Sequence, residues 1–368
     1  MDVLNLPDIL TEIFENLVES SKFSSIISDK SDNKDLFNCL LVNRLWCRTT
    51  VPLLWRQPFQ PTREHGYKAI GIYFQCMDKK DRKTIQKRGF QLPPIKIAPV
   101  FNYPSFLIGL NYRWFLNAVE DWCYKTPVKP HTGLLKCCKS AKVGQVAETD
   151  DIVFVARKLL KLLVDNNVVL KRLCISSIPR AVEAVDRKKY LIWAESEFVI
   201  LFSSVKELVV SGQFFDQAND LTSLSNLCRL VSRLVIYTWV ERNVEHESST
   251  REVGNALTTL IKNQNGLKEF CIRDAGGLSK FIISALPSQK DSLSYVRFHK
   301  VDFRNSGAWN GLTECSKLRK LSFFQCEQVT KDNVQPLFRA TFPHLKELEA
   351  KPDIHNGEHL MRWIRTMN

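Results

Sequence analysis

The chain has 368 residues, of which 44% are hydrophobic and 25% charged, a composition typical of a folded globular protein and not of a disordered one. No apolar run reaches the roughly 18 residues that a membrane-spanning helix needs, and the first seven residues lack the basic and apolar segments of a signal peptide. Eleven cysteines without a Cys-x-x-Cys pair favour free thiols in a reducing compartment. We therefore expect no membrane partner and a location in the cytoplasm, the nucleus or both.

The net charge of +13 is distributed unevenly along the chain. Residues 1–60, the head, carry six basic and eight acidic side chains, whereas residues 61–150 carry 15 and 7, and residues 151–368 carry 31 and 24. A basic body behind a mildly acidic head makes acidic partners, including nucleic acid, an alternative that must be weighed.

The head is predicted to be helical. The apolar positions of residues 6–17 follow the i, i+3, i+4, i+7 spacing of one helical face, and Pro7 suits the first turn. A second apolar helix is predicted over residues 36–55, broken near its end by Pro52, and the polar residues 18–35 are predicted to be a loop. Sixty residues bury little core by themselves, so part of the apolar surface is expected to pack against a partner.

Three sequence motifs follow one another in the head. They are Leu6-Pro7-Asp8-Ile9-Leu10 with Ile13-Phe14 and Leu17, then Val42-Asn43-Arg44-Leu45-Trp46, and finally Leu54-Trp55-Arg56. Together these motifs resemble the F-box family, although cysteine is common in the family where this chain has Asn43, and the loop is longer than in compact members. The structural alternative is an ordinary helical core.

The resemblance to the F-box implies that the head docks onto the Skp-type adaptor of a cullin-based (SCF) ubiquitin ligase. The adaptor-contact residues that it implies are Leu6, Pro7, Leu10, Ile13, Phe14, Leu17, Val42, Trp46 and Trp55.

Residues 61–150 are predicted to be a helical and irregular basic connector. Helices are expected over residues 66–77, 79–88 and 112–124, and a surface loop over residues 126–150. The second helix holds six basic residues in ten, which fits either a solvated helix face or a nucleic-acid contact. The solvated face is favoured, because the aromatic residues that interleave with basic ones in single-strand binding are absent from this run.

From residue 170 onward the pattern apolar-x-x-apolar-x-apolar recurs seven times, which indicates an internal repeat. The second positions of the pattern are Leu173, Leu208, Leu234, Phe270, Val296, Leu321 and Leu348. Four of the six intervals between them are 25 to 27 residues long, and two are about ten residues longer. A helical stretch precedes each pattern, so the unit is a helix, a turn and a short strand, and such units are expected to stack.

Over roughly residues 150–350 these repeats resemble leucine-rich repeats, and Leu318–Phe338, with Cys326, is the best single match. Elsewhere the expected Asn or Cys is replaced, by Ile178, Gln213, Trp239, Ala275 and Val301. The resemblance implies an α/β fold in which residues 151–368 form a leucine-rich-repeat-like solenoid, or horseshoe, with a capping helix over Gly357–Met367. The whole chain thus resembles a fungal-type F-box protein with irregular leucine-rich repeats.

Alternation along each predicted strand turns the intervening residues outward, onto the expected concave face. On this face, aromatic and basic side chains of the kinds enriched at binding hot spots are expected to cluster. The candidate target-binding residues are Arg233, Tyr237, Arg273, Tyr295, Arg297, His299 and Phe324. The alternative is that exposed strand positions simply tolerate any residue.

Sequence motifs for catalysis are absent: the chain has no Gly-x-Gly-x-x-Gly, no P-loop and no Gly-x-Ser-x-Gly. His355, Glu358 and His359 lack the HExxH order of a zinc site, and Cys137-Cys138 lacks a second ligand pair. We therefore expect no catalytic residue, no metal and no cofactor.

The combined interpretation is a non-catalytic substrate-recognition subunit. The head would bind the Skp-type adaptor and, through it, a cullin, while the repeats would bind a target protein. The alternative is a scaffold or binding module for acidic protein or, less favoured, for nucleic acid. A third alternative is an enzyme with an unrecognised site.

Overall fold

The computed structural model describes residues 6–19, 34–60, 66–95, 98–125, 149–176, 191–211, 218–238, 247–275, 277–303, 306, 309–351 and 362. They belong to two compact units. The first includes the described residues up to Leu170, and the second includes Lys171–Ser176 and the residues from Trp193 onward. The head and the connector thus lie in the same unit, which also contains the first residues that were assigned to the repeat region.

The head consists of three helices, α1 (Leu6–Glu19), α2 (Lys34–Cys39) and α3 (Arg44–Leu54). The single helix predicted over residues 36–55 is therefore wrong, because a turn separates α2 from α3. Asn43 caps α3, and its Oδ1 accepts a hydrogen bond from the backbone N–H of Trp46 at 3.0 Å. This cap gives a physical reason for asparagine at the position where the F-box pattern has cysteine.

The rest of the first unit contains α4 (Gly66–Cys76), α5 (Lys79–Lys87), the 3-10 helix η1 (Tyr103–Phe106), β1 (Gly109–Asn111), α6 (Tyr112–Lys125) and α7 (Thr149–Asp165). The helices predicted in the connector are confirmed. Aromatic rings fill its core: Phe59 meets Tyr73 and Phe115 edge-on, at centroid distances of 5.9 and 5.3 Å. The loop predicted over residues 126–150 lies outside the described residues up to residue 148, and α7 begins at Thr149.

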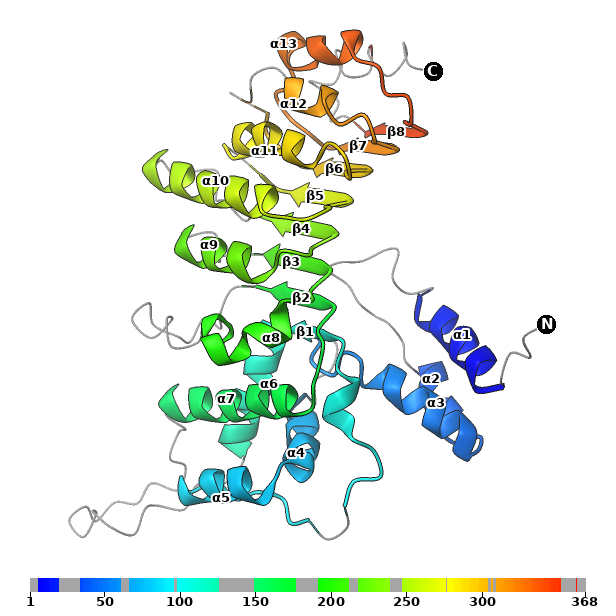
Figure 1. The fold of residues 1–368 in the computed structure, drawn as a ribbon, viewed down its shortest axis with the longest axis vertical. Helices are drawn as coiled ribbons and strands as arrows, with labels where there is room; N and C mark the ends of the chain where they lie inside the picture. Colours follow the sequence, from blue (N-terminus) through cyan, green and yellow to red (C-terminus); the bar gives the residue numbers. More distant parts are fainter. Residues whose placement is uncertain are drawn as a thin grey trace. The chain divides into compact units, whose positions relative to one another are not determined.

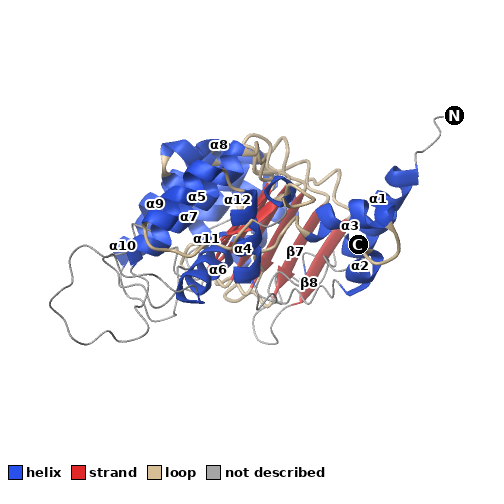
Figure 2. Cartoon of the chain, turned by 90° about the horizontal axis from the view of Figure 1, so that it is seen from below, coloured by secondary structure: helices blue, strands red, loops and turns tan. Residues whose placement is uncertain are grey.

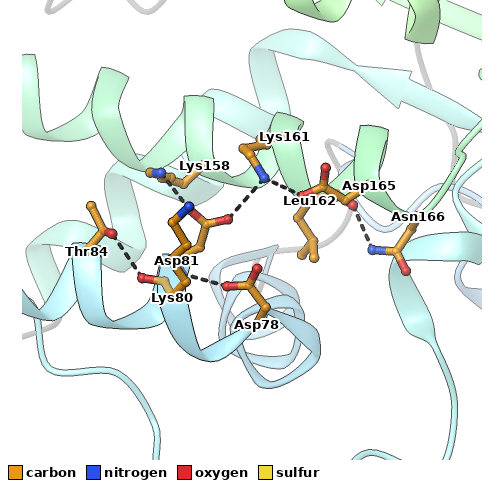
Figure 3. A network of polar contacts seen from close by, with 9 residues as sticks. All are labelled: Asp78, Lys80, Asp81, Thr84, Lys158, Lys161, Leu162, Asp165 and Asn166. Atoms are coloured by element: carbon orange, nitrogen blue, oxygen red, sulfur yellow. Dashed lines mark hydrogen bonds and ion pairs between the residues drawn. The ribbon is translucent and has the colours of Figure 1, made fainter.

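Polar contacts join α5 to α7 (Figure 3). The carboxylate of Asp81 accepts hydrogen bonds from Lys158 Nζ at 2.6 Å and from Lys161 Nζ at 3.2 Å. Burial alone would raise the pKa of Asp81, but the hydrogen bonds and charges of the two lysines hold it below its usual value. On the same helix, Arg82 is buried and donates to the carbonyl oxygens of Phe74 and Pro93. Part of the basic run is thus committed to contacts within the protein.

Asp81→Asn is expected to lower the free energy of unfolding by about 2 kcal/mol at pH 7, because both lysines lose their anionic acceptor. The stabilisation is present above the pKa of an aspartate in the unfolded chain, about 4, and is lost as the pH falls through the lower pKa of the folded state. Urea unfolding between pH 7 and pH 3 should therefore show the gap between wild type and variant closing below about pH 5. Asp165→Asn, at an exposed ion pair, is the matched control, and a pH-independent gap would contradict the assignment.

The second unit is built on a parallel sheet (Figure 1). Its described strands are β2 (Arg172–Ile175), β3 (Glu207–Ser211), β4 (Arg233–Tyr237), β5 (Glu269–Arg273), β6 (Tyr295–His299), β7 (Lys320–Phe324) and β8 (Glu347–Lys351). Each strand pairs in parallel with the next strand of the chain, and the sheet is not closed into a barrel.

The strands share the register that the repeat predicted. Leu173 pairs with Leu208, and the alignment continues through each second position as far as Leu348. From Leu173 to Leu321 these aligned side chains are completely buried. Burial of one such side chain contributes about 2 kcal/mol, so the aligned row accounts for much of the stability of this unit.

Helices form a second column beside the strands of this unit (Figure 2). They are α8 (Val199–Phe202), α9 (Ala218–Leu227), α10 (Glu247–Lys262), α11 (Ser279–Ala285), α12 (Asn310–Thr313) and α13 (Lys331–Val334), with the 3-10 helices η3 (Ile192–Ala194), η4 (Ser196–Phe198), η6 (Leu286–Gln289) and η7 (Gln335–Arg339). Neighbours in the chain pack on one another, α9 on α10, α10 on α11 and α11 on α12. The predicted unit of helix, turn and strand is thus present. The capping helix predicted over Gly357–Met367 lies outside the described residues apart from Arg362.

Side chains that precede the strands bind the backbone of the preceding repeat. Gln264 Oε1 accepts from the N–H of Val231 at 3.1 Å, and Gln289 Oε1 accepts from the N–H of Leu267 at 3.2 Å. Each glutamine thus accepts from the backbone N–H at the first apolar position of the preceding repeat pattern. Both glutamines are buried, and a buried amide in such a place ties successive repeats together.

Candidate functional site

An apolar surface is exposed on the head. Ile9, Ile13 and Leu17 recur every four residues along one side of α1, with exposed fractions of 37%, 50% and 44%. Phe37 on α2, together with Leu41 and Val42 in the turn after it, is also exposed. We call these six residues the head apolar face. Six of the fourteen exposed large hydrophobic residues in the described part of the chain thus lie within the first 42 residues.

The predicted adaptor contacts divide between the interior and the surface of the head. Leu10 and Phe14 are buried with Leu36 and Leu53, and Trp46 packs edge-on against Phe14 at 5.1 Å between ring centroids. The prediction that Leu10 and Phe14 form the contact surface is corrected, because both side chains hold the three helices together.

The remaining predicted contacts vary in exposure. Ile13, Leu17 and Val42 are exposed, and Pro7 is half-buried. Half-buried Trp55 packs on Tyr103 and Tyr73, with ring centroids 4.4 and 5.9 Å apart. The Leu6 side chain lies outside the described residues. The predicted contacts therefore include three of the six residues of the head apolar face, and they omit Ile9, Phe37 and Leu41.

In the second unit, the first outward position is charged on six of the seven described strands, the exception being Tyr295 on β6. Arg172 lies 2.7 Å from Glu207, and Arg233 lies 3.8 Å from Glu207 and 3.3 Å from Glu269. Farther along the sheet, Lys320 pairs with Glu347 at 2.6 Å. The predicted target-binding residue Arg233 is therefore already engaged within the sheet. Exposed pairs of this kind contribute little to stability, but they fix the charge pattern of the face.

The other predicted target-binding residues lie together on β4 to β7. We call Tyr237, Arg273, Tyr295, Arg297, His299 and Phe324 the aromatic–arginine face. The Arg273 guanidinium lies 5.4 Å from the centroid of the Tyr237 ring, and Arg297 lies between two rings, 5.4 Å from Tyr295 and 5.3 Å from Phe324. The His299 ring completes the set, 6.4 Å from Phe324.

Burial changes the acid–base properties of this face. It raises the pKa of Tyr237 to about 12, so the phenol stays neutral. Burial and the nearby charge of Arg273 lower the pKa of His299. A neutral imidazole can accept a hydrogen bond, and Arg273 Nε lies 3.3 Å from His299 Nδ1. The face therefore presents fixed positive charge from arginines beside neutral rings.

The neighbouring part of the sheet is apolar. Val209, Val235 and Tyr237 form a cluster with Cys174 and Cys271. These residues occupy outward positions, and the prediction that outward side chains are exposed is wrong for Val209, Val235 and Tyr237, which are buried. Alternation sets the side of the sheet on which a residue lies, but neighbouring side chains decide whether water reaches it.

No three His, Cys, Asp or Glu residues among the described ones could hold a metal ion. The predicted weak candidates His355, Glu358, His359 and Cys137-Cys138 lie outside those residues. Burial raises the pKa of the Cys228, Cys315 and Cys326 thiols to about 12, which makes them poor nucleophiles.

Within the described residues, no helix has both the length and the apolar character that crossing a bilayer requires. No family model matches the chain, and neither the curated proteins nor the solved structures contain a match to it.

Proposed function

We propose that this chain is the substrate-recognition subunit of an SCF-type ubiquitin ligase. In this proposal the head binds the Skp-type adaptor, and through it a cullin, while the outward face of the sheet in the second unit binds the target protein. The chain itself performs no chemistry, because holding a target near a ubiquitin-charged enzyme raises the effective concentration of its lysines. The complex would work in the cytoplasm, the nucleus or both.

The head apolar face is the observation that carries the proposal. Four of its six large side chains belong to the motifs that resemble the F-box, and all six are exposed in the described chain. A partner with an apolar groove would cover them, as amphipathic helices are covered in other complexes. The proposed contact set is accordingly Ile9, Ile13, Leu17, Phe37, Leu41 and Val42.

The sheet supports the second half of the proposal. The recurring interval of 25 to 27 residues, the common register and the parallel order of the strands fit a leucine-rich-repeat solenoid. Cys326, the cysteine of the best-matching repeat, is buried with its Sγ 3.6 Å from the carbonyl oxygen of Phe298 in the preceding strand. A stack of this kind presents one outward face built from many strands, which suits protein recognition.

Co-purification with a Skp-type adaptor tests the head. The double substitution Ile13→Asp/Leu17→Asp is expected to weaken adaptor binding at least about 100-fold, because two charges replace apolar contacts without disturbing the buried cluster. Val100→Asp is the matched control, since Val100 is 86% exposed and lies outside the head. Adaptor binding should be measured by titration with the purified full chain.

Two outcomes would overturn the assignment. One is that the wild-type chain binds no Skp-type adaptor, and the other is that the double variant binds as well as wild type. If the adaptor does not bind and a target peptide still binds the sheet, the chain is a scaffold outside the ubiquitin system.

A further inference from the structure

Two arginines on the aromatic–arginine face, Arg273 and Arg297, form no ion pair with a described carboxylate, although the charge of Arg297 helps to lower the pKa of Glu349. Elsewhere on the outward positions, Arg172, Arg233 and Lys320 each form an ion pair with a glutamate. Among the described residues, no carboxylate lies within ion-pair distance of Arg273 or Arg297. Among the outward side chains that the structure describes on β2 to β7, Arg273 and Arg297 are therefore the cations without an ion pair.

Two rings hold the Arg297 guanidinium in place, but its Nε–H donor is not hydrogen-bonded within the described part of the chain. Tyr295 and Phe324 flank its guanidinium, and its Nε is shielded from water without a hydrogen-bond partner in the described part of the chain. The hydroxyl of Tyr237 is also shielded, and its neighbour Arg273 carries only donors, so the O–H of Tyr237 has no acceptor among those residues. A buried donor without an acceptor costs free energy that an acceptor from outside the chain can recover. Both groups thus favour a ligand that brings acceptor oxygens.

Charge around the two arginines limits what that ligand can be. Lys320 is paired with Glu347 and Glu349, and the hydrogen bond from Lys320 lowers the pKa of Glu349, which keeps it ionised. With Glu269 on the other side, these glutamates border the face and would repel a chain with a phosphate at every unit. The apolar cluster of Val209 and Val235 likewise suits the side chains of a peptide.

The strand register sets the spacing of the two arginines. Arg297 pairs with Cys271, two residues before Arg273 on the neighbouring strand. The two Cα atoms are therefore about 8 Å apart, from one strand spacing and two residues of rise. In a β-extended peptide, side chains with one intervening residue lie on the same side, about 7 Å apart. In a polyproline II peptide, those with two intervening residues lie on the same side, about 9 Å apart.

We propose that the aromatic–arginine face binds an extended acidic peptide through two carboxylates separated by one or two residues. One carboxylate binds Arg297 between the Tyr295 and Phe324 rings, and the other binds Arg273 beside Tyr237. This inference rests on the proposed function, in which the same face binds the target, and it names the chemical class of the recognised segment.

Selection from a phage library of random twelve-residue peptides on the full-length chain tests the proposal. The selected peptides should be enriched in Asp or Glu pairs with one or two intervening residues. In fluorescence anisotropy, Arg297→Gln and Arg273→Gln should each lower the affinity for the best of these peptides at least about tenfold. Arg319→Gln, which removes an exposed charge just before β7, should leave the affinity unchanged.

A stability measurement separates binding from folding. Arg297→Gln should melt at the same temperature as wild type or higher, because it removes a half-buried arginine whose shielded Nε has no acceptor and which forms no ion pair among the described residues. A lower melting temperature together with lost binding would make Arg297 structural and overturn the proposal.

Other outcomes would also overturn it. These are the selection of no peptide, selected peptides without acidic pairs, tighter binding of a phosphoserine version of the best peptide, and displacement of that peptide by equimolar single-stranded RNA. The head variant Ile13→Asp/Leu17→Asp should bind the peptide like wild type, so failure of adaptor binding and failure of peptide binding are distinguishable.

Discussion

Gln289→Leu is expected to lower the free energy of unfolding by about 4 kcal/mol, since it leaves buried backbone groups of two repeats without partners. The side chain donates from Nε2 to the carbonyl oxygens of Ile261 and Gln264, both at 3.0 Å, and accepts from the N–H of Leu267. Leucine has a similar volume, so the loss reflects hydrogen bonding more than a cavity. Urea unfolding at neutral pH measures it.

Hydrogen exchange locates the effect of this substitution. The amide of Leu267 and the neighbouring amides of β5 should exchange faster in Gln289→Leu than in wild type, because the lost bond lies at the start of that strand. Gln335→Leu, at an exposed position, is the matched control and should change stability by less than about 0.5 kcal/mol. An equally stable Gln289→Leu would show that the amide does not hold the repeats together.

The repeat and its register could be predicted from the sequence, because the spacing of buried residues follows directly from the geometry of strands. Leu208 and Leu234 are 26 residues apart and pair directly. What covers the outward side could not be predicted by the same reasoning. Val235 is completely buried although it alternates with core positions, since its exposure depends on side chains from neighbouring strands.

The bonds between repeats were missed for a different reason. Cys228, Gln264 and Cys315 each stand three residues before the first apolar position of a repeat pattern, Val231, Leu267 and Leu318. Cys228 and Cys315 place their Sγ atoms 3.7 and 3.8 Å from carbonyl oxygens of the preceding repeat. The sequence does contain this signal, a side chain able to form a hydrogen bond at the same position of three repeats. Two cysteines and one glutamine are too different to be recognised as equivalent before their backbone partners are known.

The head shows the limit of helical periodicity. The spacing of apolar residues predicted a helix with one apolar side, and α1 is confirmed as a helix. That side is wide enough for some of its residues to pack inside the head while others stay exposed on its surface. Phe14 faces the interior and is 1% exposed, whereas its neighbour Ile13 is 50% exposed. The sequence of a helix tells which of its residues share a side. Which of those residues become buried depends on where α2 and α3 pack against it.

Gly311→Ala is expected to lower the free energy of unfolding by about 3 kcal/mol, the upper part of the range for overpacking. A Cβ atom at Gly311 on α12 would lie 2.1 Å from the carbonyl oxygen of Ile283 on α11 and 3.2 Å from Pro287 Cδ. The obstacle at Ile283 is backbone within a helix, so it cannot rotate away as a side chain does. The two helices must separate, which also loosens the packing around the neighbouring buried Trp309.

Two other glycines calibrate this prediction in the same urea assay. At Gly254 the three atoms nearest to a Cβ would all belong to the ring of Phe281, a half-buried side chain that can swing outward, so Gly254→Ala should cost about 1 kcal/mol. At Gly71, inside α4, nothing lies within 4 Å, and Gly71→Ala should stabilise by up to about 1 kcal/mol through helix propensity. Ranking the three alanine variants by free energy of unfolding separates the effect of close backbone approach from that of conformational entropy. If entropy alone mattered, alanine would stabilise the protein at all three helical positions.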